Sequence, residues 1–77
     1  MNKERRKRLE KAVKSIELAK DEVIALSEEE HEAYDNMPEG LQDSERGEAI
    51  SENVDDLESA AGDLEDIIDT LREVIER

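Results

Sequence analysis

The chain lacks cysteine, phenylalanine and tryptophan, and Tyr34 is its only aromatic residue. Without cysteine there can be no disulfide, no zinc site with thiolate ligands and no thiol nucleophile. Pro38 is the only proline, so the chain has few points at which a helix must end. A chain of 77 residues allows one small domain with a thin aliphatic core, and such chains commonly gain stability by oligomerisation.

Long apolar runs are also absent. No segment approaches the roughly 20 apolar residues that a membrane-spanning helix needs. The basic segment 3–8 leads into an amphipathic pattern, whereas a secretory signal peptide would continue with an apolar stretch. We therefore expect a cytoplasmic protein that does not associate with membranes.

The net charge of −13 is unevenly distributed along the chain. Residues 1–27 carry eight Lys/Arg and five acidic residues, whereas residues 28–77 carry nineteen acidic residues and three arginines. Disordered proteins can have such a composition, but here the apolar residues are periodic. That periodicity favours a folded helical protein.

The apolar residues of the second half repeat with alternating steps of four and three, as on the packed face of a helix. Neighbouring apolar residues widen this face beyond what one partner helix can cover. We therefore predict an oligomer seam with these members: Ile50, Val54, Leu57, Leu64, Ile67, Ile68, Leu71, Val74 and Ile75.

A second stripe in the first half predicts another helix, and it consists of Leu9, Ala12, Ile16, Ala19, Val23, Leu26, Glu30, Ala33 and Met37. The pattern stops at Pro38 and Gly40. We predict helices at 3–36 and 44–76 with a turn at 37–43, capped by Asn2 and Ser44. Leu41 is expected beneath the turn, and Gly47 is expected to admit another backbone.

The predicted fold is all-α: an antiparallel two-helix hairpin that dimerises into a four-helix bundle, in one domain spanning 1–77. The best alignment of the two stripes places Ile16 near Ile68, Leu26 near Leu57 and Ala33 near Ile50. It also brings the basic segment 3–11 beside acidic residues at the end of the second helix, namely Asp66, Asp69, Glu73 and Glu76.

The turn region resembles a known group of proteins. Residues 36–48 read N-M-P-E-G-L-Q-D-S-E-R-G-E. This stretch is similar to the N-[LM]-P-E-x-[LM]-Q-x-S-E-x-[GA]-E turn of small, uncharacterised acidic helical proteins of Gram-positive bacteria and their phages. The resemblance implies a helical hairpin and a phage or prophage origin, but it supplies no activity and no catalytic residue.

Two acidic patterns resemble the metal-binding motifs of enzymes. Glu28-x-x-His31 has the spacing of the ligand pair in di-iron bundles, but it would fall on the solvent side. The acidic residues Glu28, Glu29 and Glu32, followed by Glu52 and Asp55, are similar to the magnesium motif of all-helical nucleotide pyrophosphohydrolases. In the second pattern Glu29 and Glu32 flank the seam or face outward, and no lysine or aromatic for a base accompanies them. We predict no catalytic residue, no metal site and no cofactor.

The solvent side of the second helix carries carboxylates at helical spacing, which could imitate the phosphates of DNA. These residues are Glu52, Asp55, Glu58, Asp63, Glu65, Asp66, Asp69 and Glu73. We predict a non-enzymatic interaction module, a phage regulatory or anti-defence factor that binds a basic host protein and does not contact nucleic acid directly. The alternative is an oligomeric metal-dependent enzyme with shared carboxylates, of the pyrophosphohydrolase kind. Plain solubility would also account for the charge.

Overall fold

The computed structural model describes residues 1–77 and contains three helices and no strand. They are α1 (Lys3–Asp35), α2 (Glu39–Gln42) and α3 (Glu45–Glu76). The predicted all-α class is thus confirmed. Both long helices begin where their caps were predicted: Asn2 Oδ1 accepts the Arg5 N–H at 2.8 Å, and Ser44 Oγ accepts the Gly47 N–H at 3.3 Å.

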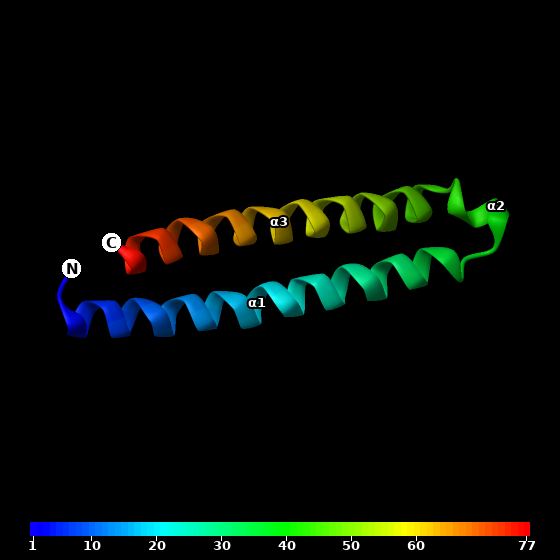
Figure 1. Cartoon of the computed structure of the whole chain (residues 1–77). Helices are drawn as coiled ribbons and strands as arrows, with labels where there is room; N and C mark the ends of the chain where they lie inside the picture. The colour runs from blue at the N-terminus through cyan, green and yellow to red at the C-terminus, as the bar shows by residue number, and fades with distance from the viewer.

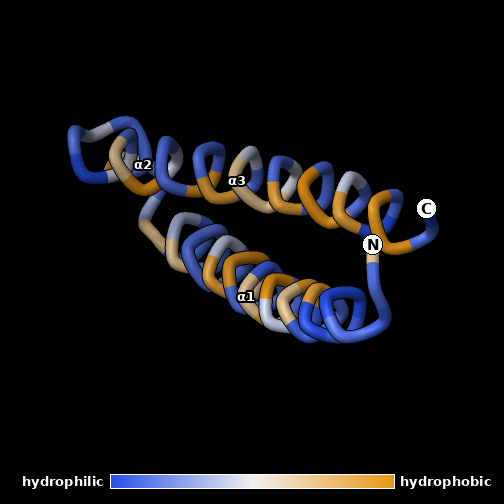
Figure 2. The backbone as a smooth tube through the Cα atoms, turned by 90° about the vertical axis from the view of Figure 1, so that its left-hand side faces the viewer, coloured by the Kyte–Doolittle hydropathy of each residue, from blue (hydrophilic) through white to orange (hydrophobic).

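The two long helices lie side by side and run in opposite directions (Figure 1). Both termini lie at one end of the molecule, here called the open end, and α2 lies at the other. The result is a rod of 59 × 14 × 13 Å in which hydrophobic segments recur along both helices (Figure 2). None of the three helices has an apolar stretch long enough to cross a membrane.

The turn at 37–43 contains more structure than predicted, because residues 39–42 form the short helix α2. The Leu41 N–H donates to the Pro38 carbonyl at 2.8 Å, and Gln42 Nε2 donates to the Tyr34 carbonyl at 3.0 Å, which fixes α2 against the end of α1. The prediction that Leu41 lies beneath the turn is wrong, since Leu41 is 52% exposed. Leu41 lines an open depression at this end of the molecule, together with Met37 and Ile50.

Gly47 is buried at the start of α3, where the α2 backbone crosses it. A Cβ added at Gly47 would lie 2.7 Å from the Leu41 carbonyl oxygen and closer still to that of Gln42. The expected close approach of a backbone is therefore present. The backbone belongs to the turn, because α2 folds back over the first turn of α3.

The packed face of α3 agrees with the sequence pattern: Val54, Ala61 and Ile68 are buried, and Ile68 is inaccessible to solvent. The alignment with α1 is also the expected one at two places. Leu26 and Leu57 line one surface depression, and Ala33 and Ile50 line another.

The packed face of α1 differs from the predicted stripe in every second position. Ala12, Ala19, Leu26 and Ala33 are exposed, and the residue that follows each of them turns toward α3: Val13, Lys20, Ser27 and Tyr34. One partner helix covers only a narrow strip of α1, and the ion pair from Lys20 to Glu65 stabilises this rotation of the helix. The apolar row that the sequence placed in the core is left uncovered.

Candidate interaction surfaces

The helix pair has two different long edges. The apolar edge carries residues spaced seven apart, Ala12, Ala19, Leu26 and Ala33 on α1 and Ala60, Ile67 and Val74 on α3. The polar edge, on the opposite side, carries Glu10, Glu17, Ile24 and His31 on α1 and Ser51, Glu58, Glu65 and Arg72 on α3. Both rows repeat every seven residues, but Asn53 continues the α3 row of the apolar edge, and the exposed Ile24 interrupts the α1 row of the polar edge.

The apolar edge exposes large side chains. Leu26 is 43% exposed and Ile67 is 47% exposed, although both carry branched aliphatic groups. The only polar link between the helices near this edge is the hydrogen bond that Asn53 Nδ2 donates to Glu30 Oε2 at 3.1 Å. An exposed apolar strip of this kind is typical of a surface that another molecule covers.

The polar edge holds the ion pairs that join the two helices. Lys20 Nζ donates to Glu65 Oε2 at 2.6 Å, and Arg72 Nη2 lies 3.0 Å from Glu17 Oε1. The hydrogen bond from Lys20 and its positive charge lower the pKa of Glu65 below its usual value. The same hydrogen bond raises the pKa of Lys20, against a smaller opposing effect of desolvation. Glu17, Glu65 and Arg72 of this edge are therefore paired within one chain.

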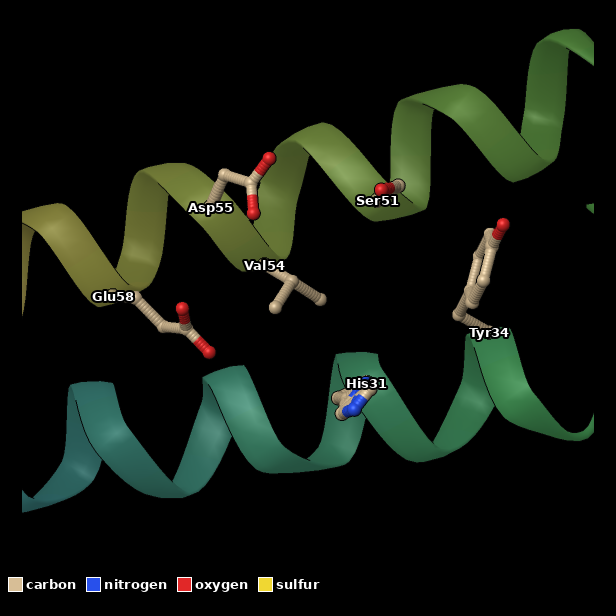
Figure 3. Close-up of a pocket in the computed structure, with 6 residues that line it drawn as sticks. All are labelled: His31, Tyr34, Ser51, Val54, Asp55 and Glu58. Carbon is tan, nitrogen blue, oxygen red and sulfur yellow. The ribbon is translucent and has the colours of Figure 1, made fainter.

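A shallow depression of about 230 Å³ lies on the polar edge, between His31 and Tyr34 of α1 and four residues of α3 that include Asp55 and Glu58 (Figure 3). The imidazole of His31 is exposed and its Nε2 lies 3.8 Å from Asp35 Oδ2. No three carboxylate or imidazole groups anywhere in the chain are grouped closely enough to hold a metal ion. The depression is open and lacks a converging ligand set.

The acidic patterns that suggested metal chemistry lie on outward surfaces. All five of their carboxylates are exposed, on α1 for Glu28, Glu29 and Glu32 and on α3 for Glu52 and Asp55. The two groups do not share a cavity, which the magnesium enzymes of that class require. Within one chain the alternative enzymatic hypothesis thus has no assembled site.

Most carboxylates of the predicted acidic face are exposed and have no cationic partner within the chain. Six of its members are exposed and form no ion pair with the chain's own cations, namely Glu52, Asp55, Asp63, Asp66, Asp69 and Glu73. Glu58 lies on the polar edge, where it is also exposed. Glu65 differs from the others, because its half-buried carboxylate is held by Lys20.

The predicted oligomer seam divides into two sets. Val54 and Ile68 are buried against α1, and Ile50, Leu57, Leu64, Leu71 and Ile75 are half-buried. Ile67 is exposed and Val74 half-buried, both at the apolar edge. The sequence interpretation missed the polar residues on the face of α1 that packs against α3. Their spacing was a usable signal, since Arg6, Lys20, Ser27 and Tyr34 are all separated by multiples of seven.

The polar residues of this α1 row are only partly satisfied. The Ser27 hydroxyl is buried and donates to the Ile24 carbonyl at 2.7 Å, but the buried Arg6 Nε has no partner. The ion pairs expected between the basic segment 3–11 and the end of α3 are not formed, and the two pairs that join the helices are Lys20–Glu65 and Glu17–Arg72. Comparison with protein-family models, curated proteins and solved structures finds no match to this chain.

Proposed function

We propose that the protein is an acidic, non-enzymatic interaction module that works as a homodimeric four-helix bundle. The observation that carries the assembly is the rotation of α1: an apolar row is exposed while a row containing Arg6, Lys20 and Ser27 faces α3. Water-exposed aliphatic rows and core-facing polar residues are the reverse of what a stable isolated pair would have. A second helix pair on the apolar edge would cover that row.

The thinness of the core supports the same assembly. Within one chain only four hydrophobic residues are buried, Val13, Val54, Ala61 and Ile68. Burial stabilises by about 25 cal/mol per Å² of apolar surface, and a core of this size leaves little to offset chain entropy. Dimerisation on the apolar edge would add the half-exposed Leu26 and Ile67 to the core.

Ile67→Glu tests the assembly, because it places a charge on the apolar edge without touching the buried Ile68. We expect light scattering to give twice 8.8 kDa for the native protein and the monomer mass for this variant. Leu18→Glu is the matched control, since Leu18 is 72% exposed and belongs to neither edge. A native protein that stays folded at the monomer mass, independent of concentration, would contradict the dimer.

The proposed partner of the bundle is a basic surface on a nucleic-acid-binding protein. The support is the outer face of α3, where exposed carboxylates recur at helical spacing without intrachain cations. Duplex DNA presents one charge per about 1.7 Å of axis, so a protein that binds phosphates could also bind such a face. With the phage-like turn at residues 36–48, this favours a regulatory or anti-defence role inside a bacterial host.

A pair of charge-matched variants tests this role. The outer-face variant removes four acids from α3, with the changes Glu52→Gln, Asp66→Asn, Asp69→Asn and Glu73→Gln. The control removes four acids from α1, with the changes Glu22→Gln, Glu28→Gln, Glu29→Gln and Glu32→Gln. Both have the same net charge, so only the location of the charge differs.

Each variant and the native protein would be immobilised and exposed to a Gram-positive host extract. We expect the native protein and the α1 control to retain a nucleic-acid-binding protein that added duplex DNA displaces, and we expect the outer-face variant to lose it. Equal retention by both variants, or a partner that DNA does not displace, would contradict charge mimicry. A partner lost on Ile67→Glu alone would place the contact on the apolar edge.

A further inference from the structure

We infer that the occupant of the apolar edge is a second copy in which each α1 lies beside the partner's α3 and runs antiparallel to it, with both open ends together. This arrangement rests on the proposed dimer and specifies it. The alternative turns the second copy end over end, which places α1 beside the partner's α1 and α3 beside the partner's α3. Charge selects the first arrangement, and side-chain size agrees with it.

Charge decides which helices are neighbours. α3 contains twelve acidic residues and two arginines, a net −10, whereas α1 contains ten acidic residues and eight Lys/Arg, a net −2. Placing α1 beside α1 would also place α3 beside α3, where the two strongly acidic helices repel each other. Alternating the helices around the bundle puts the two α3 helices on the diagonal and gives each of them two α1 neighbours.

Side-chain size agrees with this arrangement. In the antiparallel alternation, residues of the apolar edge whose numbers sum to 86 face each other, which sets Ala19 opposite Ile67 and Leu26 opposite Ala60. Each contact then joins a small residue to a large one, as interdigitating layers require.

The free charges at the open end agree with this arrangement. None of the seven Lys/Arg residues at positions 3–14 forms an ion pair within the chain, and the exposed acids at the end of α3, Asp66, Asp69, Glu73 and Glu76, form none either. With both open ends together, each basic segment lies between two acidic helix ends. The partner then supplies the carboxylates that its own chain leaves out of reach.

Because the native chain has no cysteine, single cysteines report the neighbours directly. An Ala19→Cys chain and an Ile67→Cys chain, with different tags, would be mixed, unfolded together, refolded and oxidised. We expect a disulfide-linked heterodimer on a non-reducing gel, and no link in either chain alone. The polar-edge control mixes Ile24→Cys with Glu58→Cys, which occupy the same level on the opposite side, and should stay unlinked.

Each other outcome contradicts the arrangement in a distinct way. A disulfide-linked homodimer of Ala19→Cys chains would place α1 beside the partner's α1, as in the end-over-end dimer. A link between Ala19→Cys and Ala60→Cys that exceeds the one to Ile67→Cys would show that α1 and the partner's α3 meet in another register. A link in the polar-edge control would place the interface on the other edge. A monomer mass in light scattering would instead overturn the proposed dimer itself.

Discussion

Lys20 occupies a position of α1 at which an aliphatic residue would normally contact the partner helix. Its stem lies in the helix interface, with the side chain 22% exposed, and its ammonium group reaches Glu65 at the rim. Such a side chain buries its methylenes and keeps its charge near water. The pair therefore fixes the rotation of α1 relative to α3 and makes that rotation sensitive to pH.

The titration of this pair predicts a pH dependence. The pKa of Glu65 lies below its usual 4.5 in the folded protein, so between the two values the unfolded chain binds more protons. The stabilisation is thus complete above about 4.5 and is lost as the pH falls through the lowered value. The pKa of Lys20 lies above its usual 10.5, so the stabilisation is also lost when the pH rises beyond that raised value.

Urea unfolding from pH 3 to pH 7 measures the acidic limb of this dependence. We expect Glu65→Gln to remove part of the decrease in unfolding free energy that the native protein shows below pH 4.5. Glu58→Gln is the matched control, because Glu58 lies one heptad earlier on the same edge and has no ion pair. Identical pH profiles for the two variants would show that the Lys20 contact does not contribute.

At the scale of the helices, alanine substitutions at two glycines of α3 should change the stability in opposite directions. Gly47→Ala should destabilise by about 1–3 kcal/mol, because its Cβ would meet the carbonyl groups of α2 and force the backbones apart. Gly62→Ala should stabilise by about 0.5–1 kcal/mol. No atom lies within 4 Å of a Cβ added at Gly62, and alanine has less conformational freedom than glycine in the unfolded chain. Thermal melts followed by circular dichroism measure both, and a stabilising Gly47→Ala would contradict the packing of α2 on α3.

The helix contact itself depends on the buried face of α3. Ile68→Asp should unfold the protein, because it places a charge at a site with no solvent access and costs several kcal/mol in a thin core. Asp56→Ala, on an exposed position of the same helix, should shift the melting temperature little. Equal effects of the two substitutions would mean that the assigned face of α3 is wrong.

The helices were predictable from sequence to within a residue or two, because caps at Asn2 and Ser44 and the break at Pro38 are local signals. The rotation of α1 was not. Ala19 and Lys20 are neighbours, and which one faces α3 depends on a contact to Glu65, 45 residues away. Hydropathy alone assigns Ala19 to the core, and one helix pair cannot cover the whole apolar width.

On the acidic face, too, part of the arrangement was predictable from the sequence and part depends on a contact between the helices. Helical spacing was enough to predict the outward position of residues such as Glu52 and Asp69, because both lie opposite the apolar seam. It could not separate Glu65 from them. Glu65 lies at the border of the face, and only the reach of the Lys20 side chain brings it into an ion pair.

At the scale of the whole molecule, a net charge of −13 is carried by a rod only 13–14 Å thick. At low ionic strength the Debye length exceeds this thickness, so carboxylates on opposite sides of the rod repel each other. The acidic second half of α1 lies along the acidic first half of α3, and only two ion pairs join the helices. Repulsion therefore outweighs attraction in the native chain.

Sodium chloride should consequently stabilise the protein. We expect the melting temperature to rise as NaCl increases from about 0.01 M to about 1 M, where the Debye length shrinks from roughly 30 Å to 3 Å. The four-acid variant of the outer face of α3 should start from a higher melting temperature and respond less, since part of the repulsion is already removed. A melting temperature that falls with salt would mean that the pairs Lys20–Glu65 and Glu17–Arg72 dominate over the net charge, and that the free acids contribute little to the energy of the fold.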